Sequence, residues 1–132
     1  MEEEDGIKKT ILFVVMVIIT GGLASACGPS TAAQVASPTT IATGKAVYQA
    51  NCVVCHREDG SGGKQIGTAT SADLRAKALA DAYHGDTSLI KRAILTGKDQ
   101  DNDDLDAVMP RWQGKLSDAD VNALLQYLPT FK

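Results

Sequence analysis

The apolar positions near the C-terminus follow the period of an α-helix. They recur at spacings of three and four residues and comprise Val121, Leu124, Leu125 and Leu128. Ser117 and Asp120 supply the S-x-x-D form of a helix start, and Pro129 ends the pattern because proline cannot continue a helix. The sequence therefore predicts an amphipathic helix that closes the chain.

Three further helices are predicted upstream of this one. Residues 72–83 follow a capping box at residues 70–73, and residues 88–96 have one apolar face with Gly97 at the end. An earlier stripe at spacings of 4, 4 and 3 consists of Gly44, Tyr48, Cys52 and Cys55. Together these segments predict an all-α fold of three to four helices.

A long apolar run occupies residues 10–27, directly after Lys8 and Lys9. Positive, apolar and then small residues follow one another in the order of an export signal. The string Leu23-Ala24-Ser25-Ala26-Cys27 resembles a bacterial lipobox, in which the cysteine is lipidated. An uncleaved membrane helix and a fully released chain are the alternatives, and all three place the rest of the chain outside the cytoplasm.

Small and polar residues, two prolines and no charge make up residues 28–43, which is typical of a flexible tether. The sequence therefore divides into three parts. Residues 1–26 form an export signal or membrane anchor, residues 27–43 a lipidation site and tether, and residues 44–132 one domain.

The composition bears on which classes of partner and cofactor we expect. Residues 27–132 carry 12 acidic and 11 basic side chains, and this near balance gives no reason to expect a nucleic-acid partner. Aromatic residues are only 5% of the chain, so the protein part of the core is thin for this length. A large bound cofactor would fill that gap.

Residues 52–56 supply a candidate cofactor site. They read Cys52-Val53-Val54-Cys55-His56, the C-x-x-C-H haem attachment sequence. On a helical turn both thiols can reach the two vinyl groups while His56 faces the iron. A thioredoxin-like redox pair would need a βαβ pattern, and a zinc site would need another Cys or His pair. We therefore expect one covalently bound haem c.

Residues 44–56 resemble the Gly-x-x-x-aromatic-x-x-x-Cys-x-x-Cys-His segment of class I cytochromes c, and the likeness extends to residue 132. The resemblance implies a small all-α fold packed round one haem. It also implies that Gly44 lets the first helix cross the last one closely. Tyr127 would then pack against the first helix, and Tyr48 would belong to the cofactor site.

The same family places its axial methionine in a loop ahead of the final helix, often followed by proline. Met109-Pro110 matches this pattern, and Met109 is the single thioether of residues 44–132. His84 is the one competitor, and an open position is the third possibility. We also expect Trp112 to pack near the haem edge, where its ring nitrogen could reach a propionate.

The identity of the sixth ligand decides the expected function. His/Met ligation leaves no site for a substrate, so such a haem exchanges electrons and the chain is not an enzyme by itself. It would carry single electrons at the outer face of a membrane, between redox complexes or as the monohaem subunit of a quinol-oxidising respiratory or photosynthetic complex. A haem sensor or peroxidase with an open sixth site is the alternative.

Two features depart from the family pattern. Many relatives have a proline whose carbonyl orients the proximal histidine, but no proline lies between His56 and Met109, so we expect Ile66-Gly67 to supply that carbonyl. The segment Asp99–Asp106 adds five acids before the methionine loop. It is either a solvated loop, a docking patch for a basic redox partner, or a calcium loop with two mismatched positions.

Overall fold

The structure, a computed structural model, describes residues 36–132. The export segment at residues 1–26 and the expected lipidation site Cys27 lie outside the described residues. Within residues 36–132, no helix is long and apolar enough to cross a membrane.

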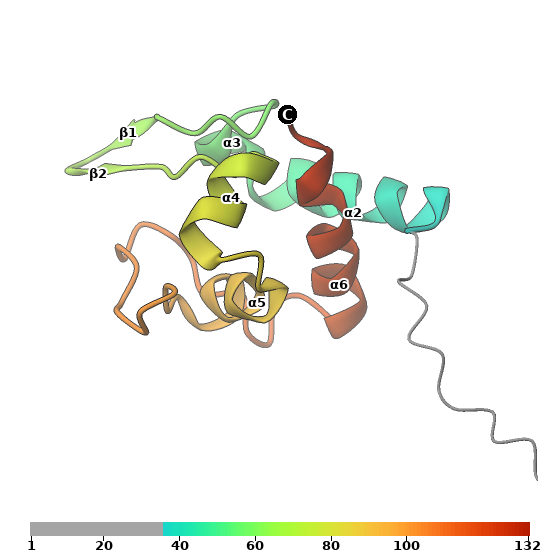
Figure 1. The fold of residues 1–132 in the computed structure, drawn as a ribbon. Helices are drawn as coiled ribbons and strands as arrows, with labels where there is room; N and C mark the ends of the chain where they lie inside the picture. The colour runs from blue at the N-terminus through green and yellow to red at the C-terminus, as the bar shows by residue number, and fades with distance from the viewer. Residues whose placement is uncertain (1–35) are drawn as a thin grey trace, which may run out of the picture. The chain divides into compact units, whose positions relative to one another are not determined.

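The described residues are mostly helical, which confirms the all-α prediction (Figure 1). The elements are α2 (Pro38–Asn51), α3 (Val53–His56), β1 (Gln65–Ile66), β2 (Ala69–Thr70), α4 (Ala76–Tyr83), α5 (Thr87–Thr96), α6 (Asp118–Tyr127) and a 3₁₀ turn (Leu128–Thr130). These residues therefore contain five α-helices, whereas three to four were expected. The extra one arises because the first predicted helix breaks at Cys52, whose φ is −118°. The two strands pair antiparallel, with Gln65 opposite Thr70.

Helix α2 begins earlier than the sequence suggested. The hydroxyl of Ser37 accepts a hydrogen bond from the backbone N–H of Thr40 at 3.1 Å, and Pro38 occupies the first helical position. Serine at the cap and proline at the first position are favoured helix starters, and here they outweigh the small, polar composition. The expected tether at residues 27–43 is therefore wrong for residues 38–43.

Helix α4 begins later than the predicted residue 72, at Ala76. The four residues before Arg75 make other bonds: the hydroxyl of Ser71 donates to the carbonyl of Cys55 at 2.8 Å, and the N–H of Leu74 donates to the carbonyl of Gly60 at 2.7 Å. The carboxylate of Asp73 accepts from the N–H of Arg75 instead of closing a capping box. The prediction was wrong here because these long-range bonds hold residues 71–74 outside the helix.

The other two predicted helices are confirmed. The carboxylate of Asp86 accepts from the N–H of Ser88 at the start of α5, and Gly97 ends this helix with a φ of +69°. Helix α6 has the expected capping box, in which Ser117 and Asp120 each bond the backbone N–H of the other.

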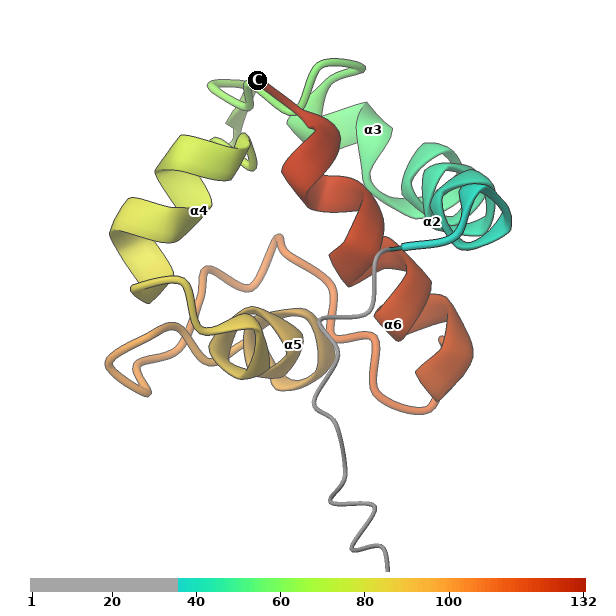
Figure 2. The same ribbon diagram turned by 45° about the vertical axis from the view of Figure 1, so that its right-hand side comes forward.

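Helices α2 and α6 cross closely, as both ribbon views show (Figures 1 and 2). Gly44 lies at the crossing: a Cβ there would overlap the carbonyl oxygen of Ala123 and lie 2.7 Å from the Cβ of Tyr127. An aromatic cluster of Tyr48, Tyr127 and Phe131 packs beside it, with ring centroids 4.9–5.7 Å apart. Helices α2 and α6 thus pack together on one side of the domain, and α4 and α5 lie on the other side (Figure 2).

Candidate functional site

One cavity of about 420 Å³ opens between α3, the hairpin, α4, α5, the loop before α6 and α6 itself. Its volume falls within the ~300–1,000 Å³ typical of small-molecule and cofactor sites. Its lining is mainly apolar, and it includes most of the predicted site residues: Cys52, Cys55, His56, Met109 and Trp112. The structure therefore brings together two short segments of the predicted site that lie more than 50 residues apart in the chain.

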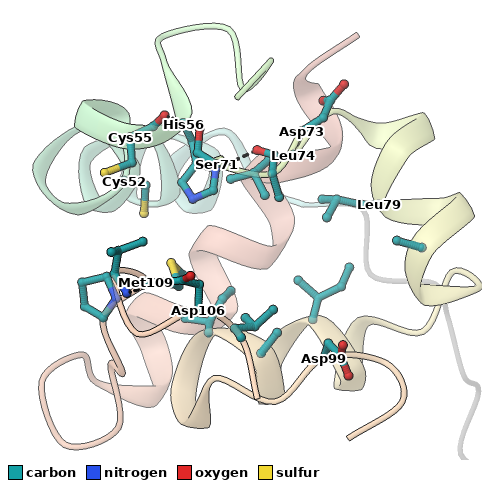
Figure 3. Close-up of a pocket in the computed structure, with 18 of the residues that line it drawn as sticks. Cys52, Cys55, His56, Ser71, Asp73, Leu74, Leu79, Asp99, Asp106 and Met109 are labelled. Carbon is teal, nitrogen blue, oxygen red and sulfur yellow. Dashed lines mark hydrogen bonds between the residues drawn. The ribbon is translucent and has the colours of Figure 1, made fainter. Parts of the chain in front are cut away.

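Helix α3 presents the two cysteines and the histidine from one wall (Figure 3). The N–H of His56 donates to the carbonyl of Cys52 at 2.9 Å, which fixes the single turn that brings the three side chains together. Both cysteines are free thiols, and burial raises the pKa of Cys52 to about 11. The Cys52 thiol is therefore protonated at neutral pH, whereas a cysteine of a redox-active pair has a lowered pKa.

His56 is held in one orientation. Its side chain is buried, with 8% exposed, and its Nδ1 lies 2.9 Å from the carbonyl oxygen of Ala72 (Figure 3). Because a carbonyl only accepts, Nδ1 carries the proton and Nε2 keeps its lone pair for a metal. Burial lowers the pKa of His56, which favours this neutral form.

The carbonyl that orients His56 comes from Ala72, so the expectation that Ile66-Gly67 supplies it was wrong. Ile66 and Gly67 lie at the tip of the hairpin, and the chain returns to the histidine only after β2. Gly62 makes the approach possible, because a Cβ at this position would lie 2.5 Å from the carbonyl carbon of Ala72. Sequence reasoning missed Gly62, although glycines at 60, 62 and 63 signalled an unusual backbone.

Met109 reaches the cavity from the opposite wall, below His56 in Figure 3. Arg111 fixes the loop that carries it: the guanidinium donates to the carbonyl of Met109 at 2.5 Å and to that of Leu105 at 2.7 Å. A Cβ at Gly97 would overlap the Arg111 side chain, so the glycine makes room for it. Sequence reasoning also missed Arg111, because the sequence around it gives no sign that it binds backbone carbonyls.

Two other residues that the sequence offered as candidates for the site do not line the cavity. His84, the competitor for the sixth position, is exposed at the end of α4 and is not among the residues that line the cavity. Tyr48, which was expected at the cofactor, does not line the cavity either. Its hydroxyl donates to the carbonyl of Arg57 at 2.7 Å, and its ring packs on Tyr127 and Phe131. Tyr48 therefore stabilises the attachment segment without lining the cavity.

The acidic segment Asp99–Asp106 forms an ordered turn. One carboxylate oxygen of Asp99 accepts from the N–H groups of Asp101 and Asp103, and Asp104 pairs with Lys98 at 2.9 Å. Asp99 also lines the cavity. Within residues 36–132 no three His, Cys, Asp or Glu residues lie so that they could hold a metal ion, so the calcium-loop interpretation has no structural support.

The donor set of the cavity fits haem c. Two cysteine thiols can form thioethers, a neutral imidazole nitrogen can bind iron, and a thioether sulfur lies on the facing wall. The mainly apolar lining suits the porphyrin.

A sequence model described as "Cytochrome c" matches residues 41–132. Among curated proteins, the cbb3-type cytochrome c oxidase subunit FixP of Azorhizobium caulinodans is 32% identical over 90 residues, which is 66% of this chain and 26% of FixP. The cbb3-type cytochrome c oxidase subunit CcoP of Cereibacter sphaeroides is 29% identical over 90 residues, with the same two shares. The chain thus spans about a quarter of the length of the curated relatives it matches. No solved structure gives a significant match.

Proposed function

This chain belongs to the cytochrome c family and transfers electrons through one covalently bound haem c, and from that premise we propose that His56 and Met109 are its axial ligands. One observation carries the proposal. The imidazole of His56 and the thioether of Met109 line one cavity from opposite walls, beside the thiols of the attachment sequence (Figure 3).

The bound haem supplies a one-electron redox centre, and the residues of the chain tune it. The carbonyl of Ala72 accepts the Nδ1 proton of His56, which orients the ring and makes Nε2 a better donor. A methionine opposite a histidine raises the reduction potential and occupies the position where a substrate or gas would bind. Met109 in this position therefore favours an electron carrier over a sensor or peroxidase.

Met109→Ala tests the ligation directly. We expect the methionine-to-iron absorption of the oxidised protein to disappear and the reduction potential to fall by on the order of 0.1 V, within the ~0.8 V that axial ligands control. The open position should also bind carbon monoxide rapidly in the reduced protein. Visible spectroscopy and a potentiometric titration measure these effects.

His84→Ala is the matched control, because it removes the competing ligand from the exposed end of α4. This variant should keep the wild-type spectrum and potential. The ligation proposal fails if Met109→Ala leaves the spectrum unchanged, or if His84→Ala changes it. Rapid carbon monoxide binding by the wild type at neutral pH would instead support the sensor or peroxidase alternative.

We further propose that the domain works at the outer face of a membrane, as a subunit or partner of a membrane redox complex. The export-like segment and Cys27 support the location, and the likeness to subunits of cbb3-type cytochrome c oxidases supports the partner. The wild-type chain should sediment with membranes and co-purify with redox subunits in detergent. Cys27→Ser should release it, and membrane retention of this variant would contradict the lipid anchor.

The acidic segment Asp99–Asp106 is the proposed docking patch for a basic partner. Asp101 and Asp103 are exposed at its tip, and the Lys98–Asp104 pair neutralises another of its acids. Electrostatic docking gives association rates that fall with ionic strength. Electron transfer to the partner that shows no salt dependence would exclude this role.

A further inference from the structure

The carbonyl that orients His56 belongs to Ala72, a residue that cannot fix its own position. In many relatives this carbonyl comes from a proline, whose ring restricts φ, but alanine leaves φ free. Ala72 is exposed and lies in the irregular segment between β2 and α4. The 2.9 Å bond between its carbonyl oxygen and Nδ1 of His56 therefore depends on the neighbouring residues.

Ser71, directly before Ala72, is held by four hydrogen bonds. Its backbone N–H donates to the carbonyl of Lys64 at 2.9 Å, and its carbonyl accepts from the N–H of Gly63 at 2.8 Å. Its hydroxyl accepts from the N–H of Lys64 at 3.0 Å and donates to the carbonyl of Cys55 at 2.8 Å. These bonds fix Ser71 although it lies outside the helices and strands.

The hydroxyl bond joins the acceptor of the histidine proton to the backbone of the histidine itself. Cys55 immediately precedes His56, and Ser71 immediately precedes Ala72. The bonds from Ser71 to Cys55 and from His56 to Ala72 therefore connect the same two segments, one residue apart (Figure 3). Because of this double connection, the imidazole and its acceptor cannot shift independently.

Backbone bonds hold the same region but do not replace the hydroxyl. The N–H of Gly62 donates to the carbonyl of His56 at 3.2 Å, and the N–H of Leu74 donates to that of Gly60 at 2.7 Å. Within the part of the chain that the structure describes, Ser71 is the one member of residues 71–74 whose side chain bonds α3.

We propose that Ser71 is a positioning residue for electron transfer: its hydroxyl takes over the restraint that a proline would supply and keeps the Ala72 carbonyl on Nδ1 of His56. A firm bond at Nδ1 makes Nε2 a better donor, which favours the more positively charged, oxidised iron. Ser71 thereby lowers the reduction potential. This inference rests on the bound haem and on His56 as its ligand, and it does not depend on the sixth ligand.

Ser71→Ala in the holoprotein tests the proposal by potentiometric titration. Loss of part of one hydrogen bond should raise the equilibrium constant for reduction about threefold, which is ~28 mV at ~59 mV per tenfold for one electron. The sign of the shift separates positioning from plain loosening of the structure. Loosening admits water to the cavity, and water stabilises the oxidised haem, so that effect would lower the potential.

Hydrogen exchange of the Nδ1 proton of His56, followed by NMR in the reduced protein, measures the bond itself. Exchange should be about tenfold faster in Ser71→Ala, the equivalent of one ordinary hydrogen bond. Amide exchange in α2 and α6 should stay at the wild-type rate, because the opening is local.

Two variants supply the controls. Ser61→Ala makes the same substitution between α3 and β1, where the hydroxyl of Ser61 donates to the exposed carboxylate of Asp59 at 2.7 Å. It should leave the potential and the Nδ1 exchange unchanged. Ser71→Thr keeps the hydroxyl and should return both measurements to the wild-type values.

The proposal is overturned if Ser71→Ala matches Ser61→Ala in either measurement, or if Ser71→Ala lowers the potential. It is equally overturned if Ser71→Thr shows the changes of Ser71→Ala, because the hydroxyl would then not be their cause. A retained methionine-to-iron absorption in Ser71→Ala excludes loss of the sixth ligand.

If Ser71→Ala does not fold, the wild type decides. The hydroxyl proton of Ser71 should exchange slowly enough to be observed by NMR in the reduced protein, because it is bonded to the carbonyl of Cys55. Exchange as fast as that of a solvent-exposed serine hydroxyl would contradict the proposal.

Discussion

The chain without haem is expected to lose its native helices at 25 °C. The cavity of about 420 Å³ is lined by residues of α3, α4, α5 and α6, so emptying it removes the contacts that the cofactor makes with these helices. At ~24 cal/mol per Å³ of cavity the cost reaches about 10 kcal/mol. A domain of this size has a total stability of only ~5–15 kcal/mol. The bound haem should therefore supply a large part of the stability of the domain, in line with its low aromatic content.

The double variant Cys52→Ser/Cys55→Ser, purified without haem, provides the measurement. Far-UV circular dichroism should show largely unfolded protein with no cooperative thermal transition. Val54→Ser is the matched control, because Val54 lies between the cysteines with 71% of its surface exposed and keeps both thioethers. This control should have the helicity of the wild type. A haem-free double variant that keeps native helicity and unfolds cooperatively would contradict the prediction.

The sequence predicted the parts of the site that depend on short segments. Cys52, Cys55 and His56 share one helical turn, so their spacing already determines that they face one wall. Met109 was predicted as the axial ligand because it is the single thioether of residues 44–132. It also lies at the position where the family places its axial methionine. Both segments line the cavity in the structure.

The supporting groups could not be predicted, because they act through the backbone. The carbonyl of Ala72 reaches His56 over 16 residues, and any residue type could supply it. Arg111 and Arg92 bind carbonyls of the acidic segment, whereas a charge pattern shows only which carboxylates an arginine could pair with. The same long-range bonds explain why α4 starts at Ala76 and not at residue 72.

Gly44→Ala is expected to destabilise the protein by about 2–3 kcal/mol, although two effects oppose each other. Alanine stabilises an α-helix by ~0.5–1 kcal/mol relative to glycine. At Gly44, however, the added Cβ would overlap the carbonyl oxygen of Ala123 and lie 2.7 Å from the Cβ of Tyr127, whereas carbon atoms pack best at ~3.5–4.0 Å. Overpacking of this kind costs ~1–3 kcal/mol, and more when rigid atoms are involved.

The cost of the overlap should exceed the gain in helix propensity, because backbone atoms of α6 cannot rotate away from the new methyl group. Helices α2 and α6 must separate instead, which loosens the packing of Tyr48, whose exposed fraction is 1%. Denaturant unfolding of the holoprotein measures the change, with Thr43→Ala as control. Thr43 is exposed on the same helix, so its variant should stay within about 0.5 kcal/mol of the wild type. If Gly44→Ala were as stable as Thr43→Ala, the close crossing of α2 and α6 would be incorrect.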